Sequence, residues 1–186
     1  MADQVCPLWM GYFHASPLRR WITGKPEALL APYVKQGMTV LEPGPGMGYF
    51  TLPLARLVGP TGRVIAVDIQ PEMLDKLEQR AYRADLQDRI EVREAEPDRF
   101  TIADWENTID FVLAFAVVHE TRSPEKFFHE AAVSLKSGGL LFFAEPAGRV
   151  GQATFEQELT AARWAGFVIM SEPDIWGSRA VVLRKV

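Results

Sequence analysis

Cysteine is almost absent from this 186-residue sequence, since Cys6 is the only one. One cysteine cannot form an intrachain disulfide, so we expect a reducing compartment and a cytoplasmic location. No apolar run approaches the length of about 18 residues that a membrane-spanning helix needs. The first residues lack a basic segment followed by an apolar run, so no signal peptide is expected.

Strong charge of either sign is also absent. The formal net charge is -4 and the pI is about 5.5, which argues against a surface that binds nucleic acid. Cys6 and His14 are too few to form a metal site, and no C-x-x-C pair is present, so we expect no metal. We expect no nucleic-acid or membrane partner, and the oligomeric state stays open.

A glycine-rich turn organises the chain. The stretch 40–48 reads VLEPGPGMG, in which two apolar residues end a predicted strand and Glu42 precedes three alternating glycines. An apolar run over 49–58 then predicts a helix. Glycines at a strand-to-helix junction let a ligand approach the backbone. About 20 residues further on, Asp68 ends a second apolar strand, where an acid that binds a ribose is expected.

Strands and helices alternate along the rest of the chain. Such alternation predicts an α/β fold of the Rossmann-like, doubly wound type, with helices on both faces of the sheet. The last two strands have no helix between them and should pair antiparallel. We therefore expect seven strands, mostly parallel with one antiparallel edge strand. The predicted strands are 38–41, 63–68, 90–94, 109–118, 140–144, 167–170 and 180–183, and the predicted helices begin near 26, 49, 71, 124 and 155.

Polar residues follow the carboxyl ends of several predicted strands. In open parallel sheets, ligands bind beyond these ends, so we expect the residues to converge on one crevice. They are Glu42, Asp68, 94–96, His119 and Glu145.

Four segments give the chain a family resemblance. They are 40–48, the VIAVD at 64–68, the DFVLAF at 110–115 and the LKSGGL at 135–140. With the final order of helix, glycine, strand and strand, the chain from about residue 26 onward resembles the class I S-adenosylmethionine-dependent methyltransferases. The resemblance implies S-adenosylmethionine as cofactor and S-adenosylhomocysteine as product.

The resemblance also implies roles for individual residues. The methionine part of the cofactor would pass over Gly44, Pro45, Gly46 and Gly48. Glu42 would help to hold its amino group, and the two oxygens of Asp68 would accept from the ribose hydroxyls. Ile69 would pack on the adenine, which Ala95 and Glu96 would frame.

One segment departs from the family pattern. An acid followed by an apolar residue often frames the adenine, whereas this chain has Glu94-Ala95-Glu96-Pro97. Two rival nucleotide folds are disfavoured. The nicotinamide fingerprint G-x-G-x-x-G would need a glycine where Tyr49 stands, and no P-loop sequence occurs.

Catalytic assignments rest on position alone. His119 follows the fourth strand and is a candidate general base, or else a residue that shapes the substrate site. Glu145 ends the fifth strand and is a candidate for binding a cationic or hydroxylated substrate, or else a plain strand-end acid. Residues 1–25 are rich in aromatic side chains, and we interpret them as an N-terminal cap or lid on a single cofactor-binding domain of residues 26–186.

The sequence therefore favours an S-adenosylmethionine-dependent methyltransferase that acts by in-line displacement on an unidentified small-molecule acceptor. The alternative is a non-catalytic protein or subunit that binds the cofactor and needs a partner. A nicotinamide-dependent oxidoreductase is a more distant alternative.

Overall fold

The computed structural model describes residues 26–96, 99–100 and 103–186. The predicted cap, 1–25, lies outside the described residues. The described residues divide into two compact units, one within residues 26–95 and one within residues 96–186, and each is described by itself. The prediction of a single domain over 26–186 stays a prediction.

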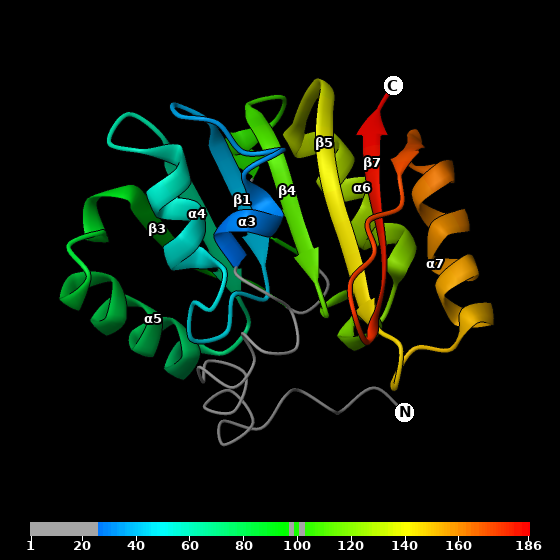
Figure 1. The fold of residues 1–186 in the computed structure, drawn as a ribbon, viewed down its shortest axis with the longest axis horizontal. Coiled ribbons are helices and arrows are strands. Elements are labelled where there is room, and N and C mark those ends of the chain that lie inside the picture. Colours follow the sequence, from blue (N-terminus) through cyan, green and yellow to red (C-terminus); the bar gives the residue numbers. More distant parts are fainter. Residues whose placement is uncertain (1–25, 97–98, 101–102) are drawn as a thin grey trace. The chain divides into compact units, whose positions relative to one another are not determined.

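The sheet of the first unit is parallel, and its strands β1 and β3 are labelled in Figure 1. Strand β2 pairs with β1 on one side and with β3 on the other. The apolar runs of β1 and β2 are almost entirely buried, as expected for parallel strands that are covered on both faces. The elements are α3 (Pro26–Leu30), β1 (Thr39–Pro43), α4 (Thr51–Val58), β2 (Arg63–Asp68), α5 (Pro71–Arg83), η1 (Gln87–Arg89) and β3 (Ile90–Glu94).

Helix α5 is amphipathic and covers β2 and β3. Pro71 opens it, and its buried side chains recur every three or four residues at Met73, Leu74, Leu77 and Ala81. Helix α4 packs on β1 and β2. It begins at Thr51, two residues later than predicted, because the glycine turn extends through Phe50.

Four strands form the sheet of the second unit. Strands β4 and β5 are parallel, and β7 is antiparallel to both β5 and β6. Helix α6 packs against α7 and β5, and α7 packs on β6. The elements are η2 (Ala103–Trp105), β4 (Ile109–Phe115), η3 (Val118–Glu120), α6 (Pro124–Ser134), β5 (Leu135–Pro146), α7 (Gln152–Trp164), β6 (Phe167–Ser171) and β7 (Ser178–Lys185).

The fold prediction is confirmed, with one refinement of the strand positions. The seven strands have the order β3-β2-β1-β4-β5-β7-β6. The reversed strand, β7, thus lies one position in from the edge, and β6 is outermost. After β5, helix α7 leads to β6 at the edge of the sheet. The chain then turns back, and β7 pairs between β5 and β6, antiparallel to both.

Several predicted boundaries in the second unit are wrong, and those around β4 and β5 have a clear structural reason. Strand β4 ends at Phe115 and not at 118, because Ala116 takes a positive φ of 58° and donates its N–H to the carbonyl of Ala144 at 2.7 Å. Helix α6 ends at Ser134, since Leu135 turns to an extended conformation and pairs with Ile109. Strand β5 therefore begins five residues before the predicted position, 140.

Aromatic side chains fill the core of the second unit. Phe128 lies edge-on to Phe127, Phe143 and Phe167, and Phe143 stacks on Phe155 of α7. These contacts join α6, α7, β5 and β6 around one buried cluster. Across the described ranges, no helix is both long enough and apolar enough to cross a membrane.

Candidate functional site

The glycine turn is held rigidly between β1 and α4. Gly44, Gly46 and Gly48 all have positive φ angles, of 66°, 52° and 82°. The N–H of Gly44 donates to the carbonyl of Val67 on β2 at 2.8 Å, and the guanidinium of Arg80 on α5 donates to the carbonyl of Met47. The turn is thus tied to its neighbouring strand and helix, in a conformation that glycine adopts at little cost.

Asp68 joins the end of β2 to this turn. Its Oδ2 accepts from the N–H of Gly46 at 3.3 Å, and its Oδ1 accepts from the N–H of Gln70 at 3.0 Å. The residue is only 8% exposed, and this burial raises the pKa of its carboxyl although the backbone hydrogen bonds oppose the rise. Each carboxylate oxygen has two acceptor positions, so both can still accept from a ligand hydroxyl.

Two of the glycines are needed for different reasons. A Cβ at Gly46 would meet no protein atom within 4 Å, so space is open beside this residue. A Cβ at Gly48 would lie 2.4 Å from Cδ1 of Leu77, so close packing requires that glycine. Open space at Gly46, next to acceptors on Asp68, fits a cofactor that carries a ribose.

The other predicted cofactor residues differ in their surroundings. Glu42 is 4% exposed on β1, Pro45 is buried, and Ile69 is 43% exposed. The N–H of Ala95 donates to the carbonyl of Asp68 at 2.9 Å. These four residues belong to the same unit as the turn, and their contacts with a cofactor stay predictions.

Glu96 belongs to the second unit. Its side chain is exposed and lies 3.9 Å from the guanidinium of Arg99. Its proposed place beside the adenine, and the convergence of all the strand-end residues on one crevice, also stay predictions.

The second unit brings together the two residues that were predicted as catalytic. Oε2 of Glu145 lies 2.5 Å from Nδ1 of His119, and Oε1 accepts from the backbone N–H of His119 at 3.1 Å. Glu145 is fully buried. One carboxylate therefore fixes both the ring and the backbone of His119, and directs the Nδ1 proton to itself, which leaves Nε2 as the basic nitrogen.

The charges around His119 favour its protonated form. Burial lowers the pKa of the imidazole, but the hydrogen bond and charge of Glu145, together with the charge of Glu120, outweigh this effect and raise the pKa above its usual value. Arg149 opposes the rise. Nε2 is a buried atom that lies 3.8 Å from Oε1 of Glu120.

Sequence reasoning missed a third member of this group, Glu158. It lies on α7, is 3% exposed, and its Oε2 makes no hydrogen bond. Burial and then the charge of Glu145 raise the pKa of Glu158 to about 7, while His119 opposes the rise. The signal was present in the helical period, because the buried face of α7 contains Phe155 and Leu159 with an acid between them.

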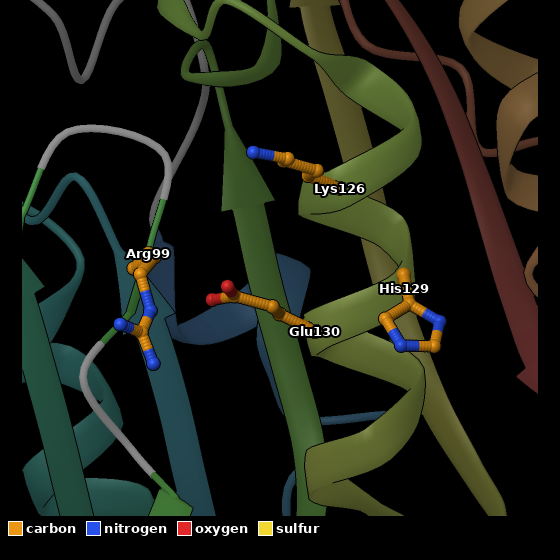
Figure 2. Close-up of a pocket in the computed structure, with 4 residues that line it drawn as sticks. All are labelled: Arg99, Lys126, His129 and Glu130. Atoms are coloured by element: carbon orange, nitrogen blue, oxygen red, sulfur yellow. The ribbon is translucent and has the colours of Figure 1, made fainter.

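A small open pocket lies elsewhere in the second unit (Figure 2). Its volume is about 260 Å³, and its lining consists of Arg99, Lys126, His129 and Glu130. Three of these residues come from α6, and the carboxylate of Glu130 also accepts from the N–H of Phe100 at 2.6 Å. None of the four was predicted as a site residue. In the described part of the chain, no group of three or more possible ligands could hold a metal ion.

The two glycines permit a paired test of cofactor binding. Gly46→Ala should reduce cofactor affinity at least tenfold, because the new methyl group enters open space, while unfolding free energy falls by only about 1–2 kcal/mol from the left-handed backbone. Gly48→Ala should cost more stability, because its methyl group also collides with Leu77. Calorimetric titration and thermal unfolding measure the two effects. Full affinity in folded Gly46→Ala would exclude this space from the cofactor site.

Comparison with known proteins supports the family that the sequence resembles. A family described as a methyltransferase domain matches residues 41–143, more than half of the chain. A solved S-adenosylmethionine-dependent methyltransferase from Aquifex aeolicus has a TM-score of 0.87 and 25% identity, and the match covers 98% of this chain and 100% of that one.

Two curated relatives have more specific names. An arsenite methyltransferase from Halobacterium salinarum is 32% identical over 116 residues, which are 62% of this chain and 28% of the relative. A ubiquinone/menaquinone biosynthesis C-methyltransferase from Klebsiella pneumoniae is 31% identical over 112 residues, 60% of this chain and 44% of the relative. The chain thus spans less than half the length of either.

The matched family segment contains the glycine turn, Asp68 and His119, and the Aquifex structure matches nearly the whole of this chain. The chain therefore belongs to the class I S-adenosylmethionine-dependent methyltransferases.

Proposed function

We propose that this chain transfers a methyl group from S-adenosylmethionine to a small molecule that gives up a hydroxyl or amine proton. The observation that carries the proposal is the buried pair of Glu145 and His119, in which the carboxylate holds the imidazole by its Nδ1 side. An imidazole held in this way can receive a proton at Nε2.

The first unit supplies the residues that would hold the cofactor. The chemistry that S-adenosylmethionine provides when bound is an electrophilic methyl group, open to in-line displacement. Asp68 would accept from the ribose hydroxyls, Gly46 has open space beside it for the cofactor, and Glu42 contributes a buried carboxylate near the end of β1. Since Asp68 also holds the N–H of Gly46, the ribose acceptor and the turn are positioned together.

In the second unit, His119 acts on the acceptor. Glu145 stabilises the imidazolium that forms when Nε2 takes the acceptor's proton, because the carboxylate is already in contact with the ring. The acceptor would thus give its proton to Nε2 while its oxygen or nitrogen takes the methyl group, and the sulfur–carbon bond would break with S-adenosylhomocysteine as the leaving group. Alignment and exclusion of water supply the remainder of the rate enhancement.

The acceptor is proposed only as a chemical class. The two curated relatives are named for arsenite and for ubiquinone/menaquinone biosynthesis, and these names point to no common acceptor. Aromatic residues are frequent in the first 25 positions, which favours a small and partly apolar molecule. A chain with a single cysteine fits a cytoplasmic location.

Binding and turnover are tested separately. Isothermal calorimetry should show saturable binding of S-adenosylmethionine and of S-adenosylhomocysteine, and none of NAD. Binding of NAD alone would refute the assignment. A screen of metabolite pools, with labelled methyl groups, should then identify an acceptor. Tight cofactor binding with no methylated product from any pool would favour a non-catalytic subunit.

A further inference from the structure

Glu158 is a buried carboxyl group that the proposed chemistry does not use. It is 3% exposed on α7, and its Oε2 has no hydrogen-bond partner. An ionised carboxylate in such surroundings loses its hydration without compensation, which is costly. A residue with no structural hydrogen bond at this atom requires another explanation for its position.

Glu158 and Glu145 both lie where α7 meets β5, each within three residues of a direct contact between the two elements, and the charges of Glu145 and His119 act on Glu158. Phe143 of β5 stacks on Phe155 of α7, with ring centroids 5.0 Å apart. Glu145 is two residues after Phe143 in an unbroken register with β7, so both point to the face that α7 covers. Glu158 is three residues after Phe155, which is about one turn further along the same face of the helix.

Few other charges lie near the cluster of His119, Glu145 and Glu158. Glu120 lies 3.8 Å from the imidazole, and Arg149 lies 3.9 Å from Glu120. The residues that α6 and β6 contribute to the core here are apolar, namely Phe127, Phe128 and Phe167. Two buried carboxyls and one imidazole therefore share an interior region of low polarity, where a change of charge on one member acts strongly on the others.

We propose that Glu158 is a positioning residue for His119, and that the charge on its buried carboxyl sets how strongly the imidazole held by Glu145 retains a proton. Ionised Glu158 stabilises the imidazolium, and neutral Glu158 does not. The three side chains therefore titrate as one coupled group. Burial that raises the pKa of Glu158 to about 7 places its charge change within the working range of a histidine.

The test is a nuclear magnetic resonance titration of the imidazole of His119, in the full chain labelled with ¹⁵N. The chain has three histidines, so substitution of His14 and of His129 assigns the signals. Glu158→Gln should lower the midpoint of His119 by roughly half a pH unit or more, because a charge that favours the imidazolium is removed. Glu158→Asp retains the charge at a greater distance, so the midpoint of His119 in this variant should lie between that of the unmodified protein and that of Glu158→Gln.

Glu156→Gln is the matched control, since Glu156 lies on the same helix but is exposed and bonded to Gln152 at 2.8 Å. It should leave the midpoint unchanged. An unchanged midpoint in folded Glu158→Gln would overturn the proposal. If that variant does not fold, Glu158→Asp decides, and a midpoint equal to that of the unmodified protein overturns it.

The catalytic consequence rests on the proposed function, whereas the titration does not. If His119 is the base, Glu158→Gln should also shift the acidic limb of the pH–rate profile to lower pH. The titration needs neither cofactor nor acceptor. A shifted midpoint with an unshifted rate profile would therefore support the role of Glu158 and reject His119 as the base.

Discussion

Replacing His119 with glutamine is expected to lower the rate constant of methyl transfer by a factor of roughly 10²–10⁴, the usual contribution of a general base. Glutamine can still donate a hydrogen bond to Glu145, so the local structure should survive. Affinity for S-adenosylmethionine should change little, since Asp68 and the glycine turn, which would hold the ribose and the methionine part, are not altered. The measurement is the rate of S-adenosylhomocysteine formation at saturating cofactor, with the acceptor found by the screen.

His129→Gln is the matched control for this substitution. His129 is exposed on α6 and is outside the group around Glu145, so its removal should leave the rate unchanged. Equal rates for His119→Gln and the unmodified protein would show that proximity and desolvation suffice, and would remove His119 from the mechanism.

The pH dependence follows from the same pair. A general base must be neutral to accept a proton, and the contact with Glu145 raises the pKa of His119 above its usual value of 6.5. Activity should therefore fall as the pH drops through this raised pKa, and should still be rising above pH 6.5. In His119→Gln this limb should be absent. A rate that is independent of pH between about 5 and 8 in the unmodified protein would contradict a base with this pKa.

The buried carboxyl of Glu158 should make the protein less stable as the pH rises. Glu158 binds its proton more tightly in the folded state than the unfolded chain does, since its pKa rises from 4.5 to about 7. The free energy of unfolding should thus decrease as the pH rises from about 4.5 to 7, by an amount on the order of 2–3 kcal/mol from this group. Glu158→Gln should remove this contribution to the pH dependence of the unfolding free energy, whereas Glu156→Gln should retain it. Denaturant titrations at pH 5 and pH 8 would measure the difference.

The sheet could be predicted because its central strands are defined by local sequence. An apolar run such as 109–115 has few alternatives to a strand buried on both faces, and glycines such as Gly59 and Gly166 end the helices that precede them. The errors at Ala116 and Leu135 have a different origin. Both residues depart from the local pattern in order to bond with an adjacent strand, and that choice depends on tertiary pairing.

The candidate site shows a similar division. Asp68 and the glycines were found because a turn between strand and helix restricts both the residue types and their spacing. The contact between His119 and Glu145 depends on how η3 folds back after β4. The two residues are 26 positions apart in the sequence, and that separation alone does not predict a contact. Glu158 appears in the sequence only as one acid on an apolar helix face, and its significance depends on which strand that face covers.

Asp68→Asn tests whether the first unit binds the cofactor through its ribose. The amide retains the volume of Asp68 but loses acceptor capacity, so affinity for S-adenosylhomocysteine should fall by about 1–3 kcal/mol, or roughly 5- to 150-fold. Glu72→Gln, an exposed change in the first turn of α5, should have no effect.

Asp68 also accepts from the N–H of Gly46, so a loss of affinity in Asp68→Asn has two causes to separate, the ribose contact and the support of the turn. A ligand that lacks one ribose hydroxyl separates the two causes. The unmodified protein should bind the deoxy analogue more weakly than S-adenosylhomocysteine, and Asp68→Asn should bind both nearly equally, since the partner of that hydroxyl is gone. Equal discrimination by the two proteins would mean that Asp68 supports the turn alone and that another residue accepts from the ribose.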